Sequence, residues 1–254
     1  MGMRRSLLTL LLTAGLLSAG GAVALADTQV GTEAPDTLIG TDDFDQLFGE
    51  AGADVLSGLA GNDYLEGGAD DDRIYAGRGR DVVSASSGDD FVDGGSNGDS
   101  LYAGPGADQV LGGAGNDTLV GQTGDDQLFG GSGRDRLYSS AGIVLLDGGS
   151  GADRLYADGS EAQIIGGSGA DTIVGVSGIF LVRGGAGKDR IRTGPESDRV
   201  SGGSSADGIA TGDGDDTIEA RDLTRDRVEC GAGVDTVIAD RFDVLRGCEV
   251  KQFP

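Results

Sequence analysis

Aliphatic residues recur at a fixed nine-residue interval along most of the chain. From residue 31 to residue 219 the sequence divides into 21 consecutive nine-residue blocks, with no insertion or deletion between them. The eighth residue of the block is Leu, Ile or Val in all 21, the sixth is Asp in 18, and the fourth is Gly in 14. Internal periodicity of this kind indicates a repeat architecture.

Each block separates into a half that favours turns and a half that favours a strand. Positions one to six are rich in Gly, Asn, Asp and Ser, which allow sharp turns. Positions seven to nine predict a very short strand with one side chain, the eighth, pointing inward. Two consecutive blocks make one coil, and stacked coils form two parallel sheets across a thin aliphatic seam. We therefore predict an all-β, right-handed parallel β-roll with no helix in the repeats.

Composition and charge narrow the classes of protein that this chain can belong to. The 254 residues include 50 Gly, 12 aromatic residues and no Trp, and the formal net charge is −24. So many carboxylates on so little bulky apolar material require a compensating partner if the chain is to fold. A polyanion is unsuited to nucleic acid or to an anionic membrane surface. The absence of His excludes His-based acid–base catalysis and His-ligated zinc.

The N-terminal segment, 1–26, has the features of an export signal. A basic start is followed by an apolar stretch and by Ala24-Leu25-Ala26, which matches an A-x-A cleavage site. Cleavage would remove Arg4 and Arg5 and lower the net charge from −24 to −26. An uncleaved membrane anchor is the alternative. We expect residues 1–26 to be a signal peptide, residues 27–219 the repeat roll, residues 220–254 a C-terminal cap, and the mature chain to be secreted without a membrane span.

The sixth-position aspartates are the candidate metal ligands. Stacked coils would bring these carboxylates close together along each edge, where their repulsion needs a cation to offset it. Calcium accepts six to eight oxygens in flexible geometry, including Asp carboxylates and turn carbonyls, whereas magnesium prefers a tighter octahedron. The candidate ligands are Asp36, Asp45, Asp54, Asp63, Asp72, Asp81, Asp90, Asp99, Asp108, Asp117, Asp126, Asp135, Asp153, Asp171, Asp189, Asp198 and Asp216.

The blocks resemble the RTX, or haemolysin-type, calcium-binding repeat, G-G-x-G-x-D-x-U-x with U aliphatic. The nearest matches include GGAGNDTLV at 112–120, GGSGADTIV at 166–174 and GGAGKDRIR at 184–192. The resemblance covers 31–219 and implies calcium held between stacked turns by the sixth-position Asp and neighbouring carbonyls. Some blocks depart from the pattern: GTEAPDTLI lacks the second and fourth Gly.

Three blocks lack the sixth-position Asp and have Val144, Ala162 and Phe180 instead. They alternate with blocks that keep the Asp, so in a coil of two blocks they stack on the same edge of the roll. We expect the other edge to bind metal continuously, and this edge to become apolar through Ile143, Val144, Ile179 and Phe180. Random decay of individual blocks is the alternative.

The ninth positions of one strand column predict an apolar stripe. Tyr102, Val120, Tyr138, Tyr156 and Val174 occupy this position in every second block. If this position faces outward, the stripe is a candidate contact surface for a cell-surface glycan or a second roll. The alternative is a stacking ladder that stabilises the sheet. Three arginines at position seven of the same column offset nearby carboxylates in the simplest interpretation: Arg136, Arg154 and Arg190.

The repeat frame fails after residue 219. A ten-residue segment, ARDLTRDRVE, is followed by CGAGVDTVI, which resumes the pattern one residue late and supplies Asp235. Cys230 and Cys248 are the two cysteines of the chain, and in an oxidising compartment a disulfide between them is the simplest prediction. Two buried thiols are the alternative.

These features favour a secreted, non-enzymatic calcium-binding protein whose folding is driven by Ca²⁺. A structural or adhesive surface module that uses a face of the roll is the main alternative. A secreted enzyme is the third class, but HExxH and nucleophile-elbow GxSxG motifs are absent, and the regular spacing already accounts for the carboxylates as ligands.

Overall fold

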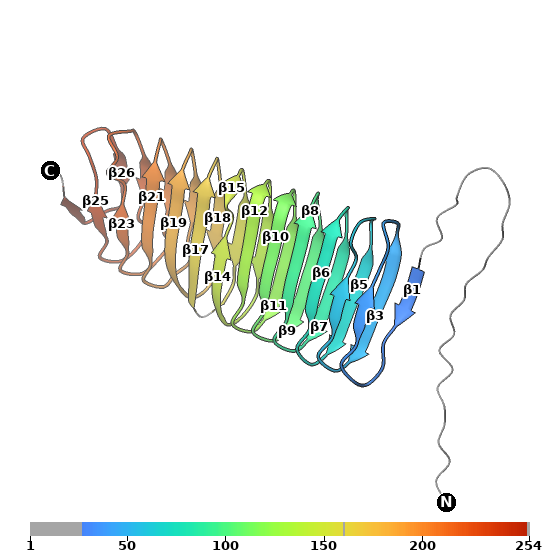
Figure 1. Ribbon diagram of the computed structural model, residues 1–254. Helices are drawn as coiled ribbons and strands as arrows, with labels where there is room; N and C mark the ends of the chain where they lie inside the picture. The colour runs from blue at the N-terminus through green and yellow to red at the C-terminus, as the bar shows by residue number, and fades with distance from the viewer. Residues whose placement is uncertain (1–26, 160, 253–254) are drawn as a thin grey trace, which may run out of the picture.

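The protein is a parallel β-roll in a computed structural model that describes residues 27–159 and 161–252. The chain coils through about twelve turns, and successive strands alternate between two facing sheets, as Figure 1 shows. No helix occurs in the described residues. The all-β roll predicted from the nine-residue period is therefore confirmed.

The first sheet has 13 strands in chain order. They are β1 (Asp27–Val30), β3 (Asp45–Ala51), β5 (Tyr64–Ala69), β7 (Val82–Ser87), β9 (Ser100–Pro105), β11 (Thr118–Thr123), β13 (Arg136–Ser139), β16 (Arg154–Ala157), β18 (Thr172–Gly175), β20 (Arg190–Arg192), β22 (Gly208–Ala210), β24 (Arg227–Glu229) and β26 (Val244–Arg246).

The second sheet has 14 strands, of which 13 follow one another in chain order, and β15 (Ser150–Gly151) pairs with β12 and β17. The others are β2 (Thr37–Ile39), β4 (Val55–Ser57), β6 (Arg73–Arg78), β8 (Phe91–Ser96), β10 (Gln109–Gly115), β12 (Gln127–Gly133), β14 (Ile143–Asp147), β17 (Glu161–Ser168), β19 (Ile179–Ala186), β21 (Arg199–Ser204), β23 (Thr217–Glu219), β25 (Thr236–Ile238) and β27 (Val250–Gln252).

Strand pairing keeps equivalent block positions in line. Leu119 pairs with Leu101 on one side and with Leu137 on the other, each two blocks away. All pairs in both sheets are parallel, and each coil itself connects one strand to the next in its sheet. This register stacks every eighth-position side chain over its counterpart, and these side chains are buried from Leu38 to Val237.

The longer strands turn three residues inward rather than the one expected from positions seven to nine. In β3 the alternation buries Asp45, Leu47 and Gly49, which are positions six, eight and one of consecutive blocks. The prediction was too narrow because the extended backbone continues past position nine into the next block, and alternate residues of an extended chain share a face. The interior column at position one therefore holds small residues such as Ala76, Ala103 and many glycines.

The predicted tyrosine stripe lies on the outer face of the first sheet. Tyr138 pairs with Val120 and Tyr156, and Tyr102 and Val174 continue the column at its two ends. The three tyrosines are 37–40% exposed, and the rings of Tyr138 and Tyr156 lie 6.3 Å apart. The geometry of the stripe is as predicted, and the ring contact is of the kind that stabilises a sheet.

The roll continues regularly beyond residue 219. Gly208 pairs with Arg227, which is one residue further along the chain than the usual spacing of two blocks. The inserted residue of the ten-residue segment therefore lies in the turn between the strands. The last strands, β26 and β27, still pair in parallel with β24 and β25. Strand pairing thus continues past residue 219, and the segment expected to cap the roll contributes the last strands of both sheets.

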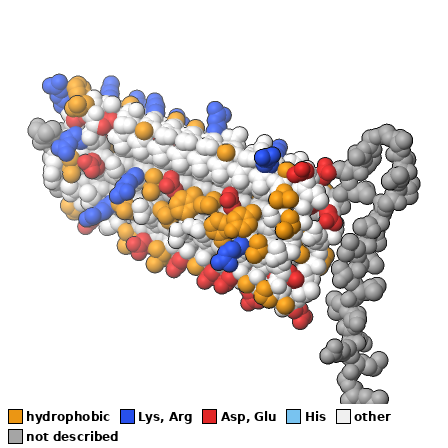
Figure 2. Space-filling view, viewed as in Figure 1, with side chains coloured by type: hydrophobic (Ala, Val, Ile, Leu, Met, Phe, Trp, Pro, Cys, Tyr) orange, Lys and Arg blue, Asp and Glu red, His pale blue; other side chains and the backbone are white. Residues whose placement is uncertain are grey.

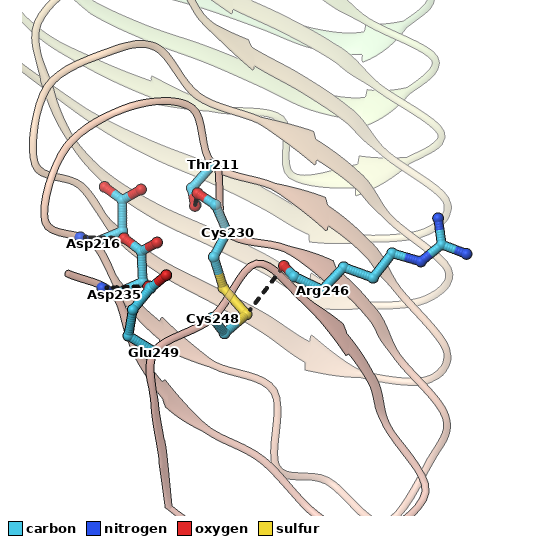
Figure 3. The surroundings of a disulfide bond; sticks show 7 residues. All are labelled: Thr211, Asp216, Cys230, Asp235, Arg246, Cys248 and Glu249. Atoms are coloured by element: carbon cyan, nitrogen blue, oxygen red, sulfur yellow. Dashed lines mark hydrogen bonds between the residues drawn. A yellow bond between two sulfur atoms is a disulfide. The ribbon is translucent and has the colours of Figure 1, made fainter. Parts of the chain in front are cut away.

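The predicted disulfide between Cys230 and Cys248 joins two successive coils at this end of the roll. Nearby, Asp216 donates its N–H to Asp235, and Asp235 donates its own N–H to Glu249, as Figure 3 shows. Glu249 therefore ends this column of acidic side chains, and the disulfide ties the last coils to the rest of the stack.

The two long edges of the roll carry opposite charge outside the sixth-position aspartates. The described turns that lead into the second sheet, without the outer strand ends and Glu249, hold eleven further acidic residues and no basic one, and we call them the acidic edge: Glu33, Glu50, Asp70, Asp71, Asp89, Asp125, Asp158, Glu161, Glu196, Asp213 and Asp215. Those that lead into the first sheet, the basic edge, hold Arg78, Arg80, Arg134, Lys188, Arg221, Arg225 and Arg241 against Asp42, Asp43, Asp222 and Asp240. Figure 2 shows acidic side chains along the lower edge and basic ones spaced along the upper edge.

Candidate metal centre

The sixth-position aspartates form hydrogen-bonded ladders inside the two edges of the roll. Asp63 is 1% exposed, and its Oδ1 accepts the backbone N–H of Asp45, one coil earlier, at 2.8 Å. Its own N–H donates to Oδ1 of Asp81 at 2.8 Å, and its carbonyl oxygen accepts the N–H of Val82 at 2.9 Å. The same arrangement repeats from coil to coil, so three of the four polar groups of each aspartate are engaged.

The fourth group, Oδ2, has no hydrogen-bond partner within the described residues in 18 of these positions. A buried acceptor without a partner costs about 1–3 kcal/mol, so this many in one small domain need a common explanation. They are the Oδ2 atoms of Asp54, Asp63, Asp72, Asp81, Asp90, Asp99, Asp108, Asp117, Asp126, Asp135, Asp153, Asp171, Asp189, Asp198, Asp207, Asp216, Asp226 and Asp235.

In blocks that begin with glycine, the unpartnered oxygen lines a small space that a side chain would fill. A Cβ added to Gly49 would lie 2.4 Å from Oδ2 of Asp54 and 2.3 Å from the carbonyl oxygen of Gly67 in the next coil. At Gly166, the corresponding distances to Oδ2 of Asp171 and to the carbonyl oxygen of Gly184 are 2.7 and 2.4 Å. Carboxylate and carbonyl oxygens from successive coils therefore face the same space.

The turns direct further carbonyl oxygens into the gap between coils. Position two has a positive φ in many turns, as at Gly131, and position four does so at Gly133. A Cβ added to Gly133 would lie only 1.3 Å from the carbonyl oxygen of Gly115 in the previous coil. Glycine is needed here because the backbone of one turn lies directly against the oxygens of its neighbour.

The oxygen set matches a hard cation that accepts backbone carbonyls. No group of three or more acidic side chains lies close enough to share a metal ion within residues 27–159 and 161–252. Any ion between two coils must therefore take most of its ligands from the turn carbonyls, with one or two carboxylate oxygens supplying charge. Calcium tolerates such a mixed and flexible set, whereas magnesium dehydrates reluctantly and requires near-ideal octahedral geometry.

Comparison with protein-family models assigns the repeats. The model of the RTX calcium-binding nonapeptide repeat matches eight segments, several of them overlapping: 30–65, 66–101, 93–128, 102–137, 111–146, 129–161, 147–179 and 183–218. The chain belongs to this family. No curated protein matches it.

No helix long and apolar enough to cross a membrane occurs in the described part of the chain. The signal peptide expected at residues 1–26 lies outside that part.

Burial raises the pKa of most RTX aspartates. The pKa of Asp99 rises from 3.8 to about 8, because the carboxyl group is desolvated and because Asp81 and Asp117 repel its charge. The same causes raise the pKa of Asp72, Asp153 and Asp207 to about 7. Without a cation, the roll holds these carboxylates at a cost that a bound ion of double positive charge would offset.

Two of the expected ligands differ from the rest. Oδ2 of Asp36 accepts the N–H and the hydroxyl of Thr32 at 2.7 and 2.8 Å. Oδ2 of Asp45 accepts the same two groups of Thr41 at 2.6 and 3.1 Å. Threonine at position two thus satisfies these carboxylates within their own turns. The other fifteen expected aspartates all have the unpartnered oxygen.

Three aspartates outside the expected set share the same surroundings. Asp207 is 3% exposed and occupies the sixth position of an ordinary block, so the nine-residue pattern itself contained the signal. Asp226 and Asp235 follow the one-residue insertion, and their Oδ1 atoms accept the N–H groups of Asp207 and Asp216. The one-residue shift in the sequence had already marked Asp235 as a repeat aspartate, and the same shift applied to the preceding segment would have found Asp226.

The interruption on the acidic edge has a different geometry from the one expected. Val144 and Phe180 are buried in the column that aspartate otherwise occupies, at 4% and 1% exposure, whereas Ile143 and Ile179 are more than half exposed. The four do not form a single apolar edge, because positions five and six point to opposite faces. A Cβ at Gly175 would lie 2.5 Å from the ring of Phe180, so the ring fills the space that Oδ2 lines elsewhere.

A second ladder, which the sequence analysis missed, runs along position five. Oδ1 of Asn62 accepts the N–H of Arg80 in the next coil at 2.8 Å, and Oδ1 of Asn116 accepts that of Arg134 at 2.8 Å. On the acidic edge, Asp71 and Asp89 act in the same way. These exposed side chains join successive turns in the opposite direction to the sixth-position ladder, and the frequent Asn-Asp and Asp-Asp pairs were their signal.

Proposed function

We propose that this RTX protein is a secreted, non-enzymatic calcium-binding protein whose roll assembles on the ion. The observation that carries the proposal is the column of buried Asp Oδ2 atoms, such as that of Asp54, which have no hydrogen-bond partner among the described residues and face carbonyl oxygens of the next coil. Bound Ca²⁺ would supply positive charge to these oxygens. The aspartates would supply the negative charge, and the glycine-rich turns would supply neutral ligands at positions that only a chain without Cβ can reach.

Folding and binding would then be one process. The chain carries a formal net charge of −24, and folding buries many of its carboxylates. In the unfolded chain these groups are solvated and far apart, so their desolvation opposes assembly when no cation is present. A ligand that binds only the folded state stabilises it in proportion to the logarithm of its concentration. Extracellular calcium would therefore favour the roll, and a calcium-poor compartment would favour the expanded chain.

The two edges should differ in how many ions they hold. On the basic edge, unpartnered Oδ2 atoms continue in every coil from Asp63 to Asp226. On the acidic edge, the column is interrupted where Val144, Ala162 and Phe180 replace aspartate. We infer a continuous row of calcium ions inside the basic edge and a broken row inside the acidic edge.

Secretion rests on the signal-like sequence of residues 1–26 and agrees with the disulfide between Cys230 and Cys248.

The exposed stripe that includes Tyr138 and Tyr156 supports a second role for the protein, as an adhesive surface for a cell-surface glycan or a second roll. Substitution of both tyrosines by serine should abolish surface or glycan binding and leave calcium stoichiometry unchanged. Undiminished binding by the double variant would rule the stripe out.

Circular dichroism tests ion-driven folding. In calcium-depleted buffer at neutral pH the spectrum should be that of a disordered chain, and millimolar Ca²⁺ should produce a β spectrum. Magnesium at the same concentration is the control and should produce little β structure. The same β spectrum with and without calcium would contradict the proposal.

A further inference from the structure

A gap in the outer face of the first sheet lies near its C-terminal end. Three neighbouring strands, β20, β22 and β24, place their position-seven residues side by side. Gly208 lies in the middle, paired with Arg190 on one side and with Arg227 on the other. Gly208 has no side chain to cover the sheet between the two arginines. The surface is therefore hollowed at this point and flanked by long cationic side chains.

Two adjoining hollows meet over Gly208. One, of about 340 Å³, is lined in part by Lys188, Arg190, Arg225 and Arg227. The other, of about 510 Å³, shares Gly208, Arg225 and Arg227 and extends toward Val244. Together they form an open groove bordered by cations from both the sheet face and the basic edge. We call this the Gly208 groove.

Four of the five basic residues that line the groove are not used to neutralise neighbouring carboxylates: Lys188, Arg190, Arg225 and Arg227. Within the described residues they form no ion pair, and the single ion pair there joins Arg246 to Glu229 at 3.7 Å. The two aspartates that line the groove, Asp189 and Asp207, are 0% and 3% exposed and are joined to each other by a hydrogen bond. The expectation that arginines of this face serve to offset carboxylates does not explain the groove.

Basic residues outnumber acidic ones in the lining of the groove even though the whole protein is an anion. The outward positions of the first sheet from Thr118 to Ala210 include no acidic residue. Glu229 is the nearest acidic side chain on that face, and it is paired with Arg246. A hollow lined mainly by basic residues can concentrate anions locally, and in a chain with a net charge of −24 it needs a specific cause.

We propose that the Gly208 groove binds a tetrahedral oxyanion, a sulfate or phosphate group. Guanidinium groups present paired N–H donors that match the oxygens of such anions, and lysine adds a point charge. Cations that approach from both sides and from the edge suit an anion with oxygens in several directions. The open shape admits either a free ion or a group carried on a larger molecule. This site is separate from the calcium columns, which lie inside the roll.

Isothermal titration of the calcium-loaded protein with sodium sulfate tests the proposal. Wild-type protein should bind one sulfate, and Arg190→Gln or Arg227→Gln should weaken binding about tenfold or more, because each removes a charge-assisted hydrogen-bonding group. Gly208→Leu should also abolish binding although it removes no charge, because the side chain fills the groove. An added Cβ at Gly208 has no atom nearer than the carbonyl oxygen of Asp189, at 3.9 Å, so this variant should fold normally.

Arg154→Gln is the matched control, because it removes the same charge from position seven of the same face, outside the groove. It should leave sulfate binding unchanged, and circular dichroism should show that every variant folds in calcium. Equal weakening by Arg154→Gln and Arg190→Gln, unaltered binding by Gly208→Leu, or the absence of sulfate binding to the wild type would each overturn the proposal.

A sulfated oligosaccharide and its desulfated counterpart distinguish the source of the anion. Tighter binding of the sulfated form than of free sulfate, lost on desulfation and in Gly208→Leu, would assign the groove to a polymer-borne group. Equal affinity for the sulfated oligosaccharide and for free sulfate would assign it to the ion itself. Undiminished binding of the desulfated form would contradict recognition of an oxyanion.

Discussion

At the residue scale, one carboxylate performs two separate tasks. In a typical sixth-position aspartate such as Asp63, Oδ1 accepts a backbone N–H and fixes the register of two coils, while Oδ2 faces carbonyl oxygens of the next coil. An asparagine would keep an acceptor for the first task, but it lacks the charge that the second requires. Substitutions at this position can therefore separate the structural ladder from the metal site.

Asp117→Asn should lose about one bound calcium, whereas Asp45→Asn should lose none. Oδ2 of Asp117 has no hydrogen-bond partner in the part of the chain that the structure describes, but Oδ2 of Asp45 is already engaged by Thr41. Stoichiometry measured by calorimetry compares the two variants directly. If both lost one ion, the hydrogen bonds from threonine would not distinguish the sites.

Val144→Ala should leave the number of bound ions unchanged, whereas Asp153→Ala should reduce it by about one. The two residues occupy the same block position in adjacent blocks, but the first is aliphatic and the second has an unpartnered oxygen. Val144→Ala should lower stability by about 1–2 kcal/mol through lost packing. Equal losses of calcium in a direct titration would contradict the assignment.

At the element scale, the unit is a coil held to its neighbours by strands and by turns that stack without side chains. The eighth-position period was enough to predict the coil length and both sheets, because the aliphatic column is buried without exception. It was not enough to predict the inward course of Asp45 and Gly49, since that depends on how far the strand extends into the next turn.

The C-terminal coils and the acidic-edge interruption show the same limit. Val244 and Leu245 lie in a strand whose turn is shorter than a standard block, so no period marked it. The position of Phe180 over Gly175 required knowledge of which glycine faces which sixth residue. Sequence spacing identifies which residues are neighbours along a column, but it does not show how far a side chain extends into the interior of the roll.

Gly133→Ala should destabilise the calcium-bound roll by about 2–4 kcal/mol, a large effect for a single methyl group. Gly133 has a positive φ, and an added Cβ would lie 1.3 Å from the carbonyl oxygen of Gly115. Gly208→Ala is the control, because its Cβ would meet no close atom. Thermal unfolding in saturating calcium measures both; an equal change in melting temperature would contradict the proposed stacking of turns.

At the scale of the whole molecule, the raised pKa values make calcium and protons alternative ways to relieve the same charge. In the calcium-free roll, the pKa of Asp99 is raised to about 8 and that of Asp108 to about 7, above the ordinary value of 3.8. The folded state then holds more protons than the unfolded chain between these values. The stabilisation is complete below pH about 4 and is lost as pH rises through about 6 to 8.

Calcium-free protein should therefore gain β structure on acidification from pH about 8 to about 5, and its calcium affinity should fall over the same interval because protons compete for the carboxylates. Circular dichroism in calcium-depleted buffer follows the first effect, and calcium titration at each pH follows the second. Stability that rises with pH in the absence of calcium would be inconsistent with the buried, uncharged carboxyls.

The most direct test of the account is an anomalous-difference map from crystals grown in millimolar calcium. It should show one peak per coil beside the Oδ2 atoms of the basic edge, from Asp63 to Asp226, in an unbroken row. The row inside the acidic edge should be interrupted at Val144, Ala162 and Phe180. A map without peaks beside the buried aspartates would contradict the claim that calcium holds successive coils together.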